Sequence, residues 1–95
     1  MLEIRPDEHA ALVDGRPLSL TMRELQLLKA LAARPQRIVT REELYAEVWG
    51  REPRHADRSV DVYVSRLRSK LSEALPGKHL IYTHSGIGYR FSPDG

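Results

Sequence analysis

The chain opens with two short apolar stretches whose residues favour β-strands. The segments LEIR (2–5) and HAALV (9–13) are separated by the Pro-Asp-Glu break at 6–8. Asp14-Gly15 follows the second stretch and is typical of a tight hairpin, because a type I′ turn needs positive φ at both central residues. The pattern predicts a small antiparallel sheet at the N-terminus.

The pattern then changes to a helical period, and two helix starts carry the same signal. Thr21 with Glu24, and Thr40 with Glu43, each form a capping box in which two side chains satisfy free backbone amides. Apolar residues at helical spacing follow both boxes: Leu25, Leu27, Leu28 and Leu31 or Ala32 in the first helix, and Leu44, Tyr45 and Val48 in the second.

Two residues mark where these helices end. Pro35 limits the first helix, and Gly50 is a natural stop for the second. The short apolar pair Ile38-Val39 lies between the helices, and we expect it to be a connector.

Residues 58–75 combine two patterns. Val60, Val62 and Val64 alternate as in a half-buried strand. A longer series recurs at spacings of four, three, four and four: Val60, Val64, Leu67, Leu71 and Leu75. At 100° per residue this series falls within an arc of about 80°, and it is long for a strand. The segment is therefore predicted to be a helix with Val62 outside its apolar stripe.

The C-terminal part returns to strand-like segments. LIYTH (80–84) and GYRFS (88–92) are joined by a glycine-bearing tip, which predicts a hairpin over residues 80–92. The expected order is strands, three helices and a hairpin, so the predicted fold class is α+β.

The composition indicates one domain, residues 1–95. Hydrophobic residues make up 41% of the chain and charged residues 29%, as in a soluble globular domain. There is no cysteine, no apolar run long enough to cross a membrane and no signal-peptide core. These features favour a cytoplasmic protein with no membrane association.

Candidate chemistry for an enzyme is sparse. The four histidines have no metal-ligand spacing, and no G-x-S-x-G nucleophile motif occurs. We therefore expect no catalytic residue, no metal, no cofactor and no small-molecule substrate.

The charge is distributed unevenly. Residues 1–33 carry four basic and five acidic side chains, a net of −1, whereas residues 58–90 carry six basic and two acidic side chains, a net of +4. A basic C-terminal half suggests a polyanionic partner, although a solvated basic surface would have the same composition.

The predicted helix 58–75 has an unusual outward face. Val62 lies furthest from the apolar stripe, with Arg58, Ser65 and Arg66 around it. In a DNA major groove, an arginine can donate two hydrogen bonds to guanine and a valine can contact a thymine methyl group. Alternatively, Val62 packs on a neighbour and the arginines are solvated. The helix alone leaves both readings open.

Four motifs in order resemble one known family. LTMRELQLLKALA (20–32), VTREELYAEVWG (39–50), RSVDVYVSRLRSKL (58–71) and IYTHSGIGYRF (81–91) resemble the C-terminal effector domain of OmpR/PhoB-type response regulators. The resemblance implies a winged helix-turn-helix fold and sequence-specific binding to double-stranded DNA in two-component regulation. It also implies head-to-tail pairing on direct repeats. Response regulators of this family carry an N-terminal receiver domain with a phosphorylated aspartate. A chain of 95 residues is too short to hold it as well, so we expect an excised module or a stand-alone domain.

The resemblance also assigns roles to individual residues. Arg66 matches a base-contacting position, and Asp61 and Val62 match positions that touch base edges in some members. The resemblance assigns four further residues mostly to the phosphates: Arg58, Tyr63, Arg68 and Lys70. It places Trp49 near the DNA backbone and matches Thr83 to a backbone-contacting position. The expected DNA surface also includes Ser59, Ser65, His84 and Ser85.

Two positions depart from the family pattern. The resemblance makes the hairpin 80–92 the wing. Wings of this family often carry arginine just before the first glycine, suited to a narrow minor groove, but this chain has Ser85 there, preceded by His84. Ser65 also stands where some members have arginine. We therefore expect phosphate contacts from the wing rather than minor-groove insertion.

The loop 50–57 (GREPRHAD) is longer than the turn of a simple helix-turn-helix. In the family this loop can contact RNA polymerase, whereas a solvent loop without a partner is the alternative. A rival to DNA binding is a winged-helix adaptor whose helix 58–75 docks a protein.

Overall fold

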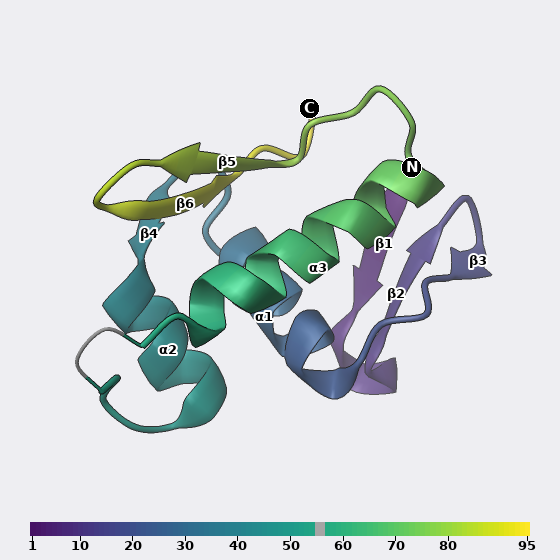
Figure 1. The fold of residues 1–95 in the computed structure, drawn as a ribbon. Helices are drawn as coiled ribbons and strands as arrows, with labels where there is room; N and C mark the ends of the chain where they lie inside the picture. The colour runs from purple at the N-terminus through teal and green to yellow at the C-terminus, as the bar shows by residue number, and fades with distance from the viewer. Residues whose placement is uncertain (55–56) are drawn as a thin grey trace.

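The computed structural model describes residues 1–54 and 57–95, so two residues of the loop 50–57 lie outside the described part. The chain begins with an antiparallel sheet in the order β1-β2-β3, formed by Leu2–Arg5, Ala10–Val13 and Arg16–Pro17. A 3-10 turn, Pro6–Glu8, joins the first two strands. The predicted N-terminal sheet is confirmed, and it lies at the opposite end of the molecule from the tip of the C-terminal hairpin (Figure 1).

Both predicted capping boxes are formed. In α1, Met22–Ala32, Glu24 N donates to Thr21 Oγ1 at 3.2 Å and Thr21 N donates to Glu24 Oε1 at 2.8 Å. The same two bonds join Thr40 and Glu43 at the start of α2, Arg41–Trp49. Gly50 ends α2 with a φ of 74°, a left-handed conformation that glycine adopts without steric cost.

The prediction that Ile38-Val39 is only a connector between α1 and α2 is wrong, because Ile38–Thr40 forms a strand, β4. β4 pairs antiparallel with β6, with Val39 opposite Tyr89 and Thr40 opposite Gly88. Three residues are too few to show a strand period, and their partner lies about fifty residues later in the chain. The C-terminal hairpin is thus part of a three-stranded sheet in the order β4-β6-β5.

The ambiguous segment is the helix α3, Ser59–Ala74, as predicted within one residue at each end. Its stripe is buried at Val60, Val64, Leu67 and Leu71. Asp57 accepts a hydrogen bond from Ser59 N at 2.8 Å, so Asp57 provides the side-chain oxygen at the helix start.

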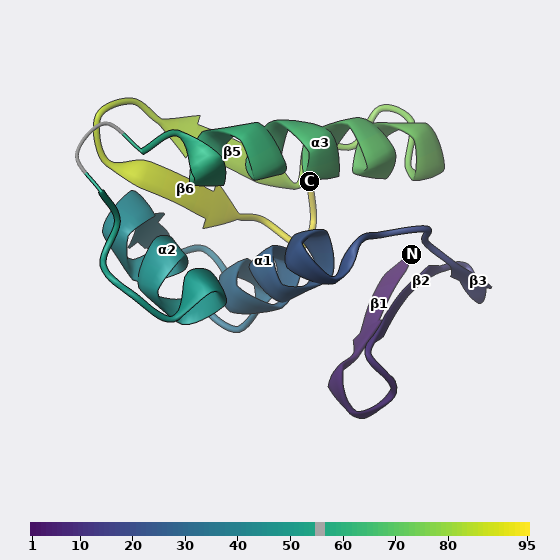
Figure 2. The same ribbon diagram turned by 60° about the horizontal axis from the view of Figure 1, so that its bottom comes forward.

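The hairpin consists of β5, Ile81–His84, and β6, Gly88–Phe91. α3 and this sheet lie together over α1 and α2 (Figure 2). The core between them is built from fully buried residues of every layer: Leu27, Leu28, Leu31, Val39, Leu44, Val64 and Leu67. Within the described part of the chain, no helix combines the length and apolar character needed to cross a membrane.

Candidate nucleic-acid interface

The outward face of α3 is the first part of the site. Val62 is 43% exposed, as expected for a side chain outside the apolar stripe of the helix. Ser65 and Arg66 are exposed beside it, one turn further along the helix. The Arg58 side chain is 80% exposed at the helix start. Val62 is therefore not packed under a neighbour, whereas the exposed arginines are consistent with both solvation and DNA contact.

Asp61 lies on the edge of this face and is held from three directions. Its Oδ1 accepts hydrogen bonds from Arg41 Nε, at 2.8 Å, and from the Tyr89 hydroxyl group. Arg58 Nε lies 3.5 Å from its Oδ2. These contacts tie the start of α3 to the start of α2 and to β6. Arg41 and Tyr89 were missed in the sequence because both are distant from Asp61 along the chain.

The electrostatics of this cluster favour the charged carboxylate. Partial burial raises the pKa of Asp61, but the hydrogen bonds from Tyr89 and Arg41 outweigh it, so the pKa lies below its ordinary value. Burial and the Asp61 charge together raise the pKa of Tyr89, which therefore keeps its hydroxyl proton. Asp61 thus accepts hydrogen bonds as an anion.

Lys70 lies on the other edge of α3 and contacts α1. Its Nζ is 2.6 Å from Oε1 of Glu24, a residue that is only 1% exposed. Burial raises the pKa of Glu24, whereas the hydrogen bonds from Lys70 and Thr21 lower it, and the net effect is a pKa below the ordinary value. The sequence assigned Lys70 to phosphates; in the structure, its ammonium group is bound within the protein.

An aromatic row connects α2 to α3. Trp49 stacks on the buried Tyr45 with ring centroids 4.9 Å apart, and Tyr63 meets Trp49 edge-on at 5.6 Å. Two guanidinium groups cover this row: Arg23 lies 5.0 Å from the Trp49 ring and Arg66 lies 5.1 Å from the Tyr63 ring. The sequence predicted Trp49, Tyr63 and Arg66 at the site, but not that they would form one stack.

The hairpin lies beside α3 and is linked to it by Arg68. Arg68 NH1 donates to Thr83 Oγ1 at 2.8 Å and to the Ile81 carbonyl at 3.3 Å. His84 Nε2 accepts from Arg90 Nε at 3.1 Å, which orients the histidine ring. Thr83 is exposed, and both it and His84 lie on β5.

The tip of the hairpin carries Ser85 and an exposed apolar residue. Ser85 is exposed, and Gly86 adopts a φ of 77°. Ile87 is 52% exposed and was not among the predicted site residues, although its place between two glycines is a signal that it lies at a tip. The structure thus brings α3, the end of α2 and the hairpin together.

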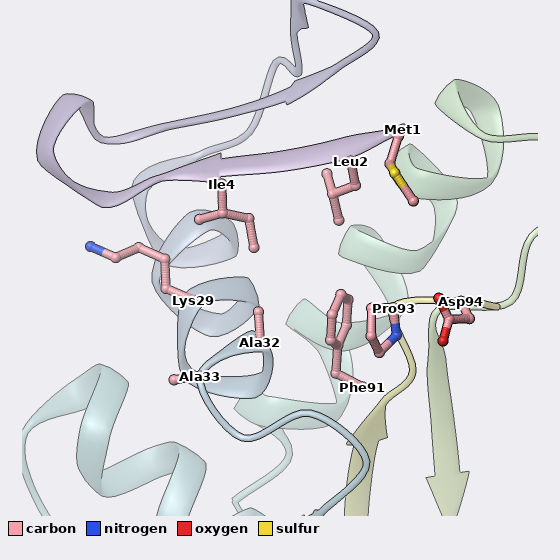
Figure 3. Close-up of a pocket in the computed structure, with 9 residues that line it drawn as sticks. All are labelled: Met1, Leu2, Ile4, Lys29, Ala32, Ala33, Phe91, Pro93 and Asp94. Carbon is pink, nitrogen blue, oxygen red and sulfur yellow. The ribbon is translucent and has the colours of Figure 1, made fainter.

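A separate apolar hollow of about 460 Å³ lies on another part of the surface. Leu2 and Ile4 of β1 point toward Ala32 of α1 and toward Phe91, whereas the Lys29 ammonium group points away (Figure 3). None of the residues that line this hollow comes from α3 or from β5. This hollow is therefore not part of the outward face of α3.

The arrangement of this chain matches known proteins closely. The sequence model of the family described as "Transcriptional regulatory protein, C terminal" matches residues 15–91. The transcriptional regulatory protein SrrA of Staphylococcus aureus is 42% identical over 91 residues, which cover 95% of this chain and 38% of SrrA. The chain thus spans less than half the length of this curated relative.

Two solved structures share both fold and sequence. The DNA-binding domain of CpxR from E. coli has a TM-score of 0.86 and 35% identity, covering 96% of this chain and 89% of that domain. The RstA DNA-binding domain of Klebsiella pneumoniae, solved in complex with the RstA box, has a TM-score of 0.86 and 33% identity, covering 97% of this chain and 91% of that domain. The fold is a winged helix-turn-helix, and the chain belongs to the family of OmpR/PhoB-type C-terminal effector domains of transcriptional regulatory proteins.

Proposed function

We propose that this chain binds double-stranded DNA sequence-specifically, as the effector module of a bacterial two-component transcription regulator that works in the cytoplasm. The observation that carries the proposal is the exposed face of α3, where Val62 stands uncovered beside Ser65 and Arg66. A helix of this width fits the major groove, where such side chains can read base edges. The RstA domain with the same fold, solved with its DNA box, supports this assignment.

The predicted site residues that remain exposed or partly exposed divide into two groups in this proposal. Arg66 donates to a guanine, and Val62 contacts a thymine methyl group. Arg58, Ser59 and Ser65 lie on or beside the same face at the first turns of α3. They position the helix on the phosphates, together with Trp49 of α2 and Thr83, His84 and Ser85 of the wing.

Three other predicted residues have contacts within the protein, and we propose a supporting role for them. Asp61 binds Arg41 and Tyr89, Lys70 binds Glu24, and Arg68 binds Thr83. Each contact joins α3 to a different element of the fold. These residues therefore hold α3 at a fixed angle against α1, α2 and the wing. They can contact DNA only with side-chain atoms that do not take part in these bonds.

A salt titration tests the proposal. Duplexes that carry a site selected from random sequences are titrated at several salt concentrations. If four to six phosphates are neutralised, the slope of log affinity against log salt is about −4 to −5, since each contact contributes about −0.9. The selected site must also bind more tightly than a scrambled duplex. Absence of binding even at low salt would favour the protein-docking adaptor instead.

Two further partners follow from family membership and belong to this proposal. We propose that two copies bind direct repeats head to tail, and that the loop 50–57 contacts RNA polymerase; His55 and Ala56 of that loop lie outside the described residues. Footprints on duplexes with one or two repeats, in the same and in inverted orientation, test the pairing. Equal affinity for inverted and direct repeats would contradict a head-to-tail arrangement.

A further inference from the structure

We propose that Tyr63 is a positioning residue for Arg66, and that its aromatic ring fixes where the guanidinium group is aimed in the major groove. The inference rests on the proposed function, because it concerns how α3 reads bases. The sequence assigned Tyr63 to phosphates, a role that uses its hydroxyl group. The positioning role uses the face of the ring instead.

The geometry of the pair supports this role. Arg66 lies three residues after Tyr63 on α3, a spacing that brings two side chains together on a helix surface. The guanidinium carbon lies 5.1 Å from the centroid of the Tyr63 ring, within the range of a cation–π contact. In the described part of the chain, the Arg66 guanidinium group forms neither an ion pair nor a hydrogen bond, and its contact is with the Tyr63 ring. The ring is thus the contact that limits the many rotamers of this arginine.

The Tyr63 ring is itself held in place by α2. Its edge-on contact with Trp49 has an interplanar angle of 72°, and Trp49 stacks on Tyr45 at 9°. Tyr45 is buried, so the row begins in the core. Tyr63 also packs against the core from its partly buried position. The orientation of Arg66 is therefore set by a chain of ring contacts that starts inside the protein.

Trp49 has a further contact, with Arg23 of α1. Arg23 lies over the Trp49 ring at 5.0 Å, and its NH1 donates to the Val48 carbonyl at 2.7 Å. This bond satisfies a carbonyl group in the last turn of α2, where cations are favoured. The end of α2 and the row of rings thus form one unit, against which Arg66 is placed.

The test separates the ring from the hydroxyl group. Tyr63→Phe keeps the ring, whereas Tyr63→Leu and Tyr63→Met remove it and keep an apolar side chain of useful size. Affinities of each variant, of Arg66→Ala and of the Tyr63→Leu/Arg66→Ala double variant are measured on the selected site and on its single-base-pair changes. Thermal unfolding of each variant shows whether it is folded. If only one of Tyr63→Leu and Tyr63→Met folds, that variant is compared with Tyr63→Phe.

We expect Tyr63→Phe to keep the base preference of the unaltered protein. Loss of the ring is expected to lower discrimination about two- to fivefold, the size of an exposed cation–π contact, at the base pair that Arg66→Ala relaxes. In the Arg66→Ala background, Tyr63→Leu should change that discrimination no further, because the two residues act together.

Two results would overturn this inference and leave the proposed function standing. If Tyr63→Phe weakens binding as much as Tyr63→Leu does, the hydroxyl group is the contact. If the ring-deleted variants lose affinity equally on every duplex, Tyr63 supports the fold and does not aim Arg66. Absence of DNA binding by the unaltered protein would instead overturn the proposed function, and this inference with it.

Discussion

Lys70 Nζ lies 2.6 Å from Glu24 Oε1, so an ammonium group at the edge of the outward face of α3 is bound to a buried carboxylate of α1. The same carboxylate accepts a hydrogen bond from the backbone amide of Thr21 and so caps α1. One side chain thus stabilises the start of α1 and joins it to α3. We expect this pair to act on stability more than on DNA affinity.

Replacing Lys70 by methionine tests that expectation. The change leaves Glu24 as a buried charge without its partner, and we expect the free energy of unfolding to fall by about 1–3 kcal/mol, since Lys70 is only partly buried. Urea denaturation measures the loss. The salt slope of DNA binding should stay unchanged; a slope reduced by about 1 would show that Lys70 binds a phosphate.

Acid should weaken the fold through the Glu24 and Asp61 carboxyl groups. Their pKa values lie below the ordinary 4.5 and 3.8, so their contribution to stability is complete above the unfolded pKa values. It is lost as the pH falls through the lower folded values. Denaturation between pH 7 and pH 3 measures this loss, and Glu24→Gln, which cannot titrate, should show a flatter profile. An identical profile for the variant would contradict the role of Glu24.

Arg66→Ala should relax the base preference at one position of the binding site. A lost bidentate contact to guanine costs about 1–3 kcal/mol at that base pair and little elsewhere. Affinities on single-base-pair changes of the site measure this effect. Lys29→Ala is the matched control, because Lys29 lies on α1 beside the apolar hollow, away from α3. An equal loss on all duplexes would make Arg66 a phosphate contact.

Gly88→Ala should disrupt the sheet that carries the wing. A Cβ atom at this position would lie 2.0 Å from the Val39 carbonyl oxygen, so β4 and β6 must separate. We expect a loss on the order of 3 kcal/mol in thermal or urea unfolding. Gly86→Ala, where a Cβ meets open space but φ is positive, should cost only about 1–2 kcal/mol. Equal losses for the two variants would show that the β4 contact is unimportant.

Ser85→Arg should strengthen binding through the wing. Ser85 is exposed at the hairpin tip, next to the glycine turn. An arginine there adds a charge suited to a narrow A·T-rich minor groove, so affinity should rise most for sites with such a flank. The salt slope should become steeper by about 1. Ser85→Gln, similar in reach but uncharged, provides the control, and an equal gain from glutamine would exclude a charge effect.

Local sequence signals predicted the elements well and their partners poorly. The two capping boxes and the stripe of α3 depend on residues within a few positions of one another, so the sequence displays them directly. β4 depends on a partner about fifty residues away, and three residues carry no period of their own. The exposed face of α3 was predictable because the helical period fixes what is left outside the stripe.

The same limit explains what the sequence could not say about individual site residues. Lys70 and Arg68 have the charge and spacing of DNA contacts, and Asp61 was placed at the site by its family position; the sequence pattern cannot distinguish a free charge from a paired one. Their partners, Tyr89 for Asp61 and Glu24 for Lys70, come from strands and helices that only the folded chain brings near.

The pairing of β4 with β6 makes the wing part of the frame that holds α2. β6 is the central strand of its sheet, and β4 continues directly into Arg41, the first residue of α2. Backbone hydrogen bonds between β4 and β6 therefore set the separation between the wing and the start of α2. In the proposed DNA complex, α2 and the wing both contact the duplex. We therefore expect a base pair inserted between their two contact points to weaken binding, because the hairpin cannot shift without breaking these backbone hydrogen bonds.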